Sequence, residues 1–384
     1  MGVLFFVLLL ISIGSLYSMR DSNSPPQWDK YSVAFALAMA SPVLAVLFSQ
    51  FYHGSFSARP YDGASRFLFA IPMFFALRQR NIRIVAAMQL GIPLGVFVGF
   101  VALKLHPFDW GGRYTTSEFF NLIHFSDTAL ILGFLSLFSI NSLRKDHALL
   151  CLFKIFAFLL GIYMSIQSGE RGGWLAIPPL LLIWVFYQSK EKIWLKLTIT
   201  TVLILCAAWL SYFMLDVVHS RVNSIFDDLN NFFHGNKDTS LGIRLQHWQA
   251  ALYLFAGHPF FGVGPDQFEK IIPELEAMGM LTPLAAKIGH SELHNEILAK
   301  CTETGLFGFA SILSVFIVPL FIFKQTIRSP HDAVRIASVM GVCLVSGFFI
   351  FGLTVEIFNL KMTASFFALT LALLMASATN KSIR

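Results

Sequence analysis

Two histidines, His290 and His294, have a spacing that suggests chemistry. Residues four apart on a helix share a face, so we expect the two imidazoles to point the same way. This spacing occurs in zinc sites, and the run HSELH superficially resembles a metalloprotease helix. In that motif the glutamate directly follows the first histidine, whereas Glu292 follows it by two residues. We therefore expect no metal, and interpret His294 as a general base for a hydroxyl, with simple packing as the alternative.

Two arginines lie in segments that favour anion binding. Arg171 belongs to SGERGGW, residues 168–174, and a guanidinium can grip a phosphate through two parallel hydrogen bonds. The alternative for Arg171 is that it extends to lipid phosphates. Arg244 precedes His247 and Trp248 by one helical turn and is expected to share their face. Its alternative role is a surface ion pair on an exposed helix.

The composition indicates that these residues belong to a membrane protein. Of the 384 residues, 56% are apolar and 13% are charged, against about 25% charged in an ordinary soluble domain. These values exclude a cytosolic enzyme, a disordered protein and a secreted disulfide scaffold. The net charge of +6 does not indicate nucleic-acid binding, because Lys and Arg in membrane proteins mostly mark cytoplasmic loops. The four cysteines form no metal or redox motif.

Eleven apolar segments approach the length of about 20 residues that a spanning helix needs. They are 2–18, 31–52, 66–78, 84–104, 119–141, 147–168, 172–188, 193–217, 297–323, 334–354 and 358–378. The pattern predicts an all-α polytopic membrane protein with about 11–12 transmembrane helices, the first of them retained and not cleaved as a signal peptide. Basic residues recur in alternate loops, which we expect in the cytoplasm together with the C-terminus. They are Arg78, Arg80, Arg83, Arg144, Lys145, Lys190, Lys192, Lys196, Lys324, Arg328, Lys381 and Arg384.

One long loop separates the predicted spans. We expect helices over 1–217, a periplasmic loop domain over 218–296, and further helices and a short cytoplasmic tail over 297–384. The loop is acidic on balance and long enough to be functional. Its pattern predicts a helix capped by Ser240 and, after 281–283, a helix that continues through His290 and His294 into the ninth span. Between them, the turn-rich apolar run HPFFGVGP is expected to pack on the membrane surface.

Three motifs together resemble a known family. HNEILAKCTETGLFGF, which begins at His294, fits the pattern H-[NSQ]-x9-G-x-x-[GTY] of the bacterial O-antigen ligases. That group includes O-antigen polymerases and protein O-oligosaccharyltransferases. SGERGGWLA and the pattern R-x3-W-x2-A, at Arg244, Trp248 and Ala251, also agree. The resemblance covers roughly 160–310, and departs from the family in that members typically have twelve spans with the N-terminus inside.

The resemblance implies a GT-C-like glycosyltransferase of the bacterial inner membrane. It would move a preassembled glycan from undecaprenyl diphosphate to lipid A–core oligosaccharide at the periplasmic face, without a cofactor or metal and with inversion. His294 would be the base, while Arg171 and Arg244 would hold the diphosphate. His290, Trp248 and Asn295 are further substrate-binding candidates. No Asp/Glu cluster for a metal is expected on the outer side, and the partners are the donor, the acceptor and membrane lipids, not nucleic acid.

Other activities remain open at this point. The same site residues suit an O-antigen polymerase or a protein O-oligosaccharyltransferase. A transporter of polyprenyl glycans would need ionisable residues along a path through the bilayer, for which Asp127, Lys154 and Glu303 are the candidates. Should His294 not be the base, Glu292 and Asp266 are the next candidates. The glycan, the acceptor sugar and the oligomeric state do not follow from the sequence.

Overall fold

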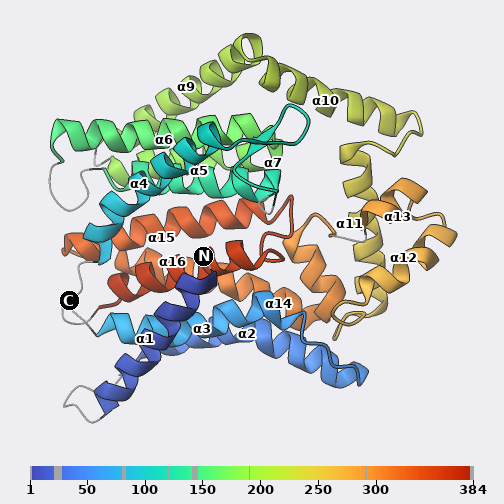
Figure 1. The fold of residues 1–384 in the computed structure, drawn as a ribbon, viewed down its shortest axis with the longest axis horizontal. Coiled ribbons are helices and arrows are strands. Elements are labelled where there is room, and N and C mark those ends of the chain that lie inside the picture. The colour runs from blue at the N-terminus through green and yellow to red at the C-terminus, as the bar shows by residue number, and fades with distance from the viewer. Residues whose placement is uncertain are drawn as a thin grey trace. The chain divides into compact units, whose positions relative to one another are not determined.

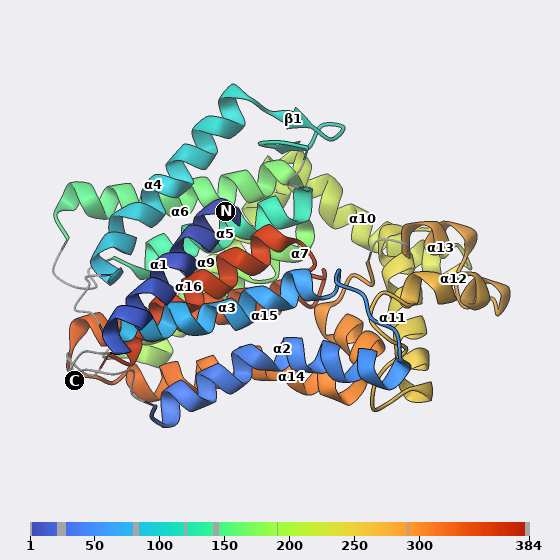
Figure 2. The same cartoon turned by 60° about the horizontal axis from the view of Figure 1, so that its bottom comes forward.

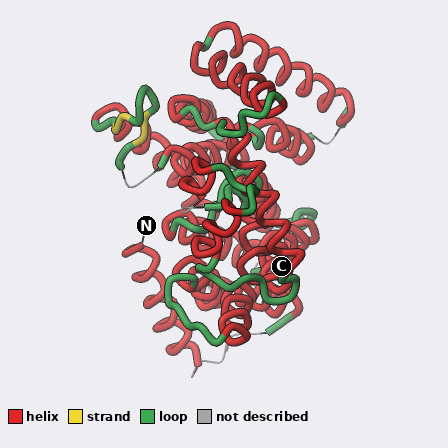
Figure 3. Tube along the Cα trace, turned by 90° about the vertical axis from the view of Figure 1, so that its right-hand side faces the viewer, coloured by secondary structure: helices red, strands yellow, loops and turns green. Residues whose placement is uncertain are grey.

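The computed structural model describes residues 2–20, 28–79, 84–118, 121–140, 146–189, 191–289 and 292–380. Most of this chain is helical, and the two strands described, β1 (Phe108–Asp109) and β2 (Tyr114–Thr115), form one short antiparallel hairpin (Figure 3). The helices are α1 (Gly2–Arg20), α2 (Lys30–His53), α3 (Tyr61–Arg78), α4 (Ile84–Leu105), α5 (Leu122–Phe138), α6 (Ala148–Ser168), α7 (Arg171–Trp174), α8 (Ile177–Gln188), α9 (Ile193–Met214), α10 (Asp216–Phe233), α11 (Ser240–Gly257), α12 (Phe268–Ala277), α13 (Pro283–Gly289), α14 (Glu296–Thr326), α15 (Asp332–Phe351) and α16 (Lys361–Ala378).

The predicted fold class is confirmed. Within the described part of the chain, eight helices are long and apolar enough to cross a membrane, namely α1, α2, α4, α6, α9, α14, α15 and α16. The other three predicted spans do not form helices of this kind: 66–78 lies in the 18-residue α3, which carries three charged residues, 119–141 contains the 17-residue α5, and 172–188 is broken between α7 and α8. The break follows from Pro178 and Pro179, which have no N–H to continue a helix from α7 and therefore suit the start of α8.

The topology of the chain across the membrane stays a prediction. Many of the basic residues that carry the argument lie outside the described residues: Arg80, Arg83, Arg144, Lys145, Lys190, Lys381 and Arg384.

The chain divides into two compact units. The domain boundaries that we predicted at 217 and 296 stay a prediction. Unit 1 comprises Met1–Phe75, Asn223–Pro319 and Gly352–Leu369, and unit 2 comprises Ala76–Val222, Leu320–Phe351 and Thr370–Arg384.

In unit 1, α2 runs alongside α14 (Figures 1 and 2), and the hydroxyls of Ser41 and Ser314 lie 2.9 Å apart between them. Helices α11, α12 and α13 share a separate apolar core with the first turn of α14. The prediction that Ser240 caps α11 was wrong by one residue. Thr239 is the cap, because its extended backbone lets its hydroxyl accept a hydrogen bond from Gly242 N at 3.1 Å.

Helix α14 is interrupted at Gly305, where φ is 65° and ψ is −147°. The turn-rich run HPFFGVGP fills the interruption and satisfies the backbone groups that it frees. Val263 N donates to Thr302 O at 2.8 Å, and Leu306 N donates to Pro259 O at 2.7 Å. A Cβ at residue 305 would overlap the backbone carbonyl of Phe260, so only glycine fits. The break therefore provides the place where residues 258–264 pack against α14.

In unit 2, α5 and α6 pack closely because glycines face each other. A Cβ on Gly161 would lie only 2.7 Å from the carbonyl oxygen of Ala129. Lys154, a residue considered for transport, is fully buried in α6 and forms an ion pair with Asp146 at 2.9 Å. Its ammonium also donates to Ser139 O at 2.9 Å, so this lysine is neutralised where it lies.

Candidate active site

His294 lies in a tight turn between α13 and α14, and not on a helix. Its φ of 55° is in the left-handed region, so the prediction of a helix that continues through His294 is wrong at this residue. Helix α13 ends at Gly289 and α14 begins at Glu296, after His294. His290 lies outside the described residues. The turn gives the His294 side chain an orientation that a continuous helix would not give.

The His294 imidazole is held by two neighbours. Its Nδ1 lies 2.6 Å from the Oε1 of Glu292, and both side chains are 14% exposed. The ring of His247 stacks on it, with centroids 5.7 Å apart and an interplanar angle of 29°. Contact with a carboxylate at Nδ1 leaves Nε2 as the ring nitrogen for a substrate, the arrangement that orients a histidine base. Sequence reasoning placed Glu292 only as a substitute base, since spacing alone did not show this contact.

His247 is a buried neutral support for this base. It is fully buried on α11, and its Nε2 donates to the carbonyl of Ala285 at 2.8 Å. Burial lowers the pKa of His247, partly offset by that hydrogen bond, and the neighbouring His294 lowers it further. The ring also fits against the backbone of Gly289, where a Cβ would lie 2.8 Å from Nε2. An uncharged ring can pack against His294 without competing for its proton.

The turn is tied to the segment between α15 and α16. The carboxylate of Glu356 accepts a hydrogen bond from Leu293 N, and Gly352 O accepts one from Glu296 N at 2.8 Å. Burial raises the pKa of Glu356 well above its ordinary value, and the nearby Glu303 adds to this while Lys300 opposes it. Sequence reasoning missed Glu356, whose sole signal was a carboxylate between two apolar spans.

Asn295 has a structural role in the same turn. Its Oδ1 accepts from Leu298 N at 3.1 Å, which caps α14, and its Nδ2 donates to Leu353 O at 3.2 Å. Both ends of the amide are therefore engaged by the protein. A role in substrate binding stays a prediction for this residue.

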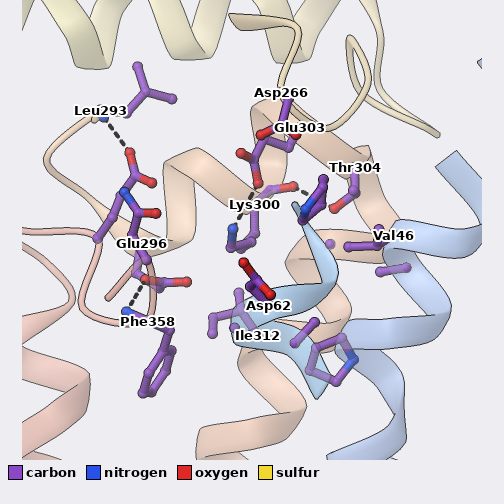
Figure 4. Close-up of a pocket in the computed structure, with 18 of the residues that line it drawn as sticks. Val46, Asp62, Asp266, Leu293, Glu296, Lys300, Glu303, Thr304, Ile312 and Phe358 are labelled. Carbon is purple, nitrogen blue, oxygen red and sulfur yellow. Dashed lines mark hydrogen bonds and ion pairs between the residues drawn. The ribbon is translucent and has the colours of Figure 1, made fainter. Parts of the chain in front are cut away.

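A cavity of about 320 Å³ lies beside the turn, within unit 1 (Figure 4). Its acidic lining residues are Asp62, Asp266, Glu269, Glu292, Glu296, Glu303 and Glu356, and its basic ones are Arg59, Lys300 and Lys361. Lys300 pairs with Glu303 at 2.7 Å, and Lys361 pairs with Asp62 at 2.6 Å. Four distant segments bring these carboxylates together, which the sequence analysis did not predict. No group of three His, Cys, Asp or Glu residues suited to a metal occurs in the described ranges.

Arg244 and Trp248 lie on α11, in the same unit as His294. Arg244 is half-buried and, as predicted, precedes His247 and Trp248 by one turn of the same helix. The indole Nε1 of Trp248 is buried and has no hydrogen-bond partner in the part of the chain that the structure describes. A buried donor without a partner is costly to leave unsatisfied. A role of Trp248 in substrate binding stays a prediction.

Arg171 belongs to unit 2, where it begins α7. Three guanidinium groups gather on this segment. Arg113 pairs with Glu170 at 2.8 Å, Arg221 Nε donates to Gly169 O at 2.7 Å, and Arg171 Nη1 donates to Arg221 O at 3.1 Å. The guanidinium groups of Arg113, Arg171 and Arg221 thus all lie around residues 169–171, with the carboxylates of Glu170 and Asp127 close to the same segment. Sequence reasoning did not include Arg113 or Arg221, which come from other elements.

The helices and the site together define an all-α, multi-pass membrane protein with a histidine–carboxylate pair at the end of a broken helix. Residues 156–313 match the model of the family described as O-antigen ligase. An uncharacterized protein of Haemophilus influenzae is 26% identical over 298 residues, which cover 76% of this chain and 73% of that protein. An O-antigen ligase of Escherichia coli K12 is 26% identical over 198 residues, which cover 49% of this chain and 44% of that protein.

These matches confirm the resemblance to the O-antigen ligase family. The matched region contains Arg171, Arg244, Trp248, His294 and Gly305. At the level of the family, these matches support a glycosyltransferase-type enzyme of the ligase kind.

Proposed function

We propose that this protein is an O-antigen ligase of the bacterial inner membrane. It transfers a preassembled glycan from undecaprenyl diphosphate to the lipid A–core oligosaccharide at the periplasmic face. The observation that carries the proposal is the contact between His294 Nδ1 and Glu292 Oε1 at 2.6 Å, beside a cavity. This pair combines with the family match to supply a base for a sugar hydroxyl.

The reaction is a single displacement at the anomeric carbon. His294 Nε2 takes the proton of the acceptor hydroxyl while that oxygen attacks the anomeric carbon of the donor. The bond between this carbon and the diphosphate oxygen breaks, and its electron pair leaves with the diphosphate. Attack opposite to the leaving group inverts the configuration. Glu292 stabilises the imidazolium that forms, since its carboxylate faces Nδ1.

The leaving diphosphate needs positive charge, which arginine side chains supply. We assign this role to Arg171, supported by the guanidinium groups of Arg113 and Arg221 beside it, and to Arg244 on α11. Fixed guanidinium groups stabilise developing phosphate charge without a bound ion. The proposal therefore includes transfer that is independent of metal.

The test is a transfer assay with the full chain in nanodiscs. The donor is an undecaprenyl-diphosphate-linked glycan and the acceptor is purified lipid A–core oligosaccharide, with and without EDTA. We expect glycan on the lipid A–core in both conditions. Glycan joined to a second donor-linked glycan would identify a polymerase instead, and glycan on a peptide a protein oligosaccharyltransferase. If EDTA abolishes transfer and added Mg²⁺ or Mn²⁺ restores it, the proposal that Arg171 and Arg244 stabilise the diphosphate without a metal would be contradicted.

A further inference from the structure

The cavity beside His294 is lined by many charged side chains and is unlike a site for a phosphate. Seven carboxylates line it against three cations. Lys300 and Lys361 are each in contact with a carboxylate, at 2.7 and 2.6 Å. The lining therefore repels a diphosphate, because its charge is predominantly negative. At about 320 Å³ it lies near the lower end of the range for small-molecule sites, about 300–1,000 Å³.

One lining side chain is incompletely satisfied inside the protein. Glu296 is 1% exposed, and its Oε2 accepts a hydrogen bond from Phe358 N at 3.0 Å. Its Oε1 has no hydrogen-bond partner among the residues that the structure describes. Figure 4 shows Glu296, Lys300 and Asp62 pointing toward the same space. A buried oxygen without a partner costs free energy that a ligand can recover, because the ligand supplies the missing hydrogen bond.

We propose that this cavity is a sugar subsite, in which Glu296 Oε1 makes a hydrogen bond with a sugar hydroxyl. Hydroxyls both donate and accept hydrogen bonds, so they match a lining of carboxylates and ammonium groups better than an anion does. Lys300 and the other carboxylates then contact further hydroxyls of the same ring.

The sugar lies beside the reacting groups, because Glu292 both lines the cavity and contacts His294. This inference rests on the proposed function for the identity of the sugar. It can be the core sugar of the acceptor or the first sugar of the donor, which share the same hydroxyl chemistry. The experiment separates these two sources.

The main variant is Glu296→Gln. The amide oxygen can still accept from Phe358 N, so the segment between α15 and α16 keeps its anchor, while a neutral amide replaces the carboxylate. We expect the KM for one sugar substrate to rise about five- to tenfold, the difference between a charge-assisted and a neutral hydrogen bond. The matched control is Glu276→Gln, which removes an exposed carboxylate from α12 of the same unit.

A second variant, Ala64→Leu, tests the cavity without touching a carboxylate. Ala64 lines the cavity from α3, and the larger side chain occupies space that the sugar needs. We expect it to raise the same KM as Glu296→Gln does. Unchanged KM values for both substrates in either variant, with the thermal unfolding midpoint preserved, would overturn the subsite.

Saturation-transfer NMR on the full chain in nanodiscs provides a readout that does not need turnover. The probes are the core oligosaccharide released from lipid A and the glycan released from the donor. The subsite belongs to whichever probe loses its signal in Glu296→Gln. Transfer that occurs without any effect of this variant on sugar binding or KM would contradict the proposed subsite but not the proposed ligase activity. If Glu296→Gln weakens sugar binding but the wild type shows no transfer, the proposed ligase activity would be contradicted and the proposed subsite would not.

Discussion

Glu292 Oε1 lies 2.6 Å from His294 Nδ1, and the two residues are separated in the chain by one residue, Leu293. The left-handed backbone of His294, with φ of 55°, folds the turn so that the two side chains meet. Leu293 between them is fixed through its N–H by Glu356, which comes from a distant segment. The base and its orienting carboxylate are therefore one local unit that a remote residue holds in place.

Glu292→Gln removes the charge opposite His294 Nδ1 and keeps the size of the side chain. We expect kcat to fall on the order of 10²-fold, with the KM for the donor nearly unchanged, because Glu292 stabilises an imidazolium that forms only during reaction. Steady-state transfer kinetics measure both parameters. Glu274→Gln, an exposed carboxylate on α12, is the control. A variant with normal kcat would mean that Glu292 only packs against the ring.

His294→Gly and His294→Ala separate the chemistry from the backbone. Both remove the base, so transfer should fall by about 10²–10⁴-fold in each while donor binding persists. Glycine adopts a φ of 55° without strain, whereas alanine does so at a cost of about 1 kcal/mol. Thermal unfolding should therefore find the glycine variant more stable than the alanine variant. Loss of donor binding in both would instead make His294 a phosphate ligand.

Arg171→Ala should raise the donor KM and lower kcat/KM by about 10²–10³-fold, since a charge that stabilises the leaving diphosphate is lost. Arg171→Lys should recover only part of this loss, because an ammonium lacks the planar fork of a guanidinium. Kinetics at varied donor concentration give the comparison, with the exposed Arg328→Ala as control. Full activity of the lysine variant would show that bulk charge suffices.

Gly305→Ala should destabilise the protein by about 3 kcal/mol or more, because the added Cβ meets the Phe260 carbonyl and the backbone has positive φ. Gly279→Ala is a matched control: its φ is 72°, but open space surrounds it. We expect about 1 kcal/mol there from strain alone. Chemical denaturation in nanodiscs checks the difference. Equal losses would mean that HPFFGVGP does not dock in the break of α14.

His247 should make stability depend on pH. Its pKa in the folded protein is lowered by burial, whereas in the unfolded chain it is about 6.5. Below that pH the unfolded state binds a proton that the folded state does not yet bind. The free energy of unfolding therefore decreases as the pH is lowered, by at most about 1.4 kcal/mol per pH unit, until the folded protein also binds the proton. Denaturation curves from about pH 5 to 7.5 should show a shallower dependence in His247→Gln and an unchanged one in His258→Gln, an exposed histidine.

The long apolar helices followed directly from the sequence, because hydrophobicity and length are local properties. The turn at His294 did not, since i, i+4 spacing favours one helix and the chain breaks it with a left-handed residue. The acidic cavity was also missed. It draws Asp62, Asp266, Glu296 and Glu356 from four separate segments, and their proximity is a tertiary property. Single residues with motif support, such as Arg244, were placed on the correct element.

The tie between the His294 turn and residues 352–358 has a consequence for how the protein is made. Leu293 N and the Glu296 carboxylate find their partners in Glu356 and Phe358, which are synthesised some 60 residues later. During translation, the turn emerges and α14 can enter the membrane before these partners exist. The segment that carries the base thus lacks these two anchors in the nascent chain, and it gains them only after α15 has been synthesised. Assembly of the site is in this sense a late event of biogenesis, set by the order of the chain.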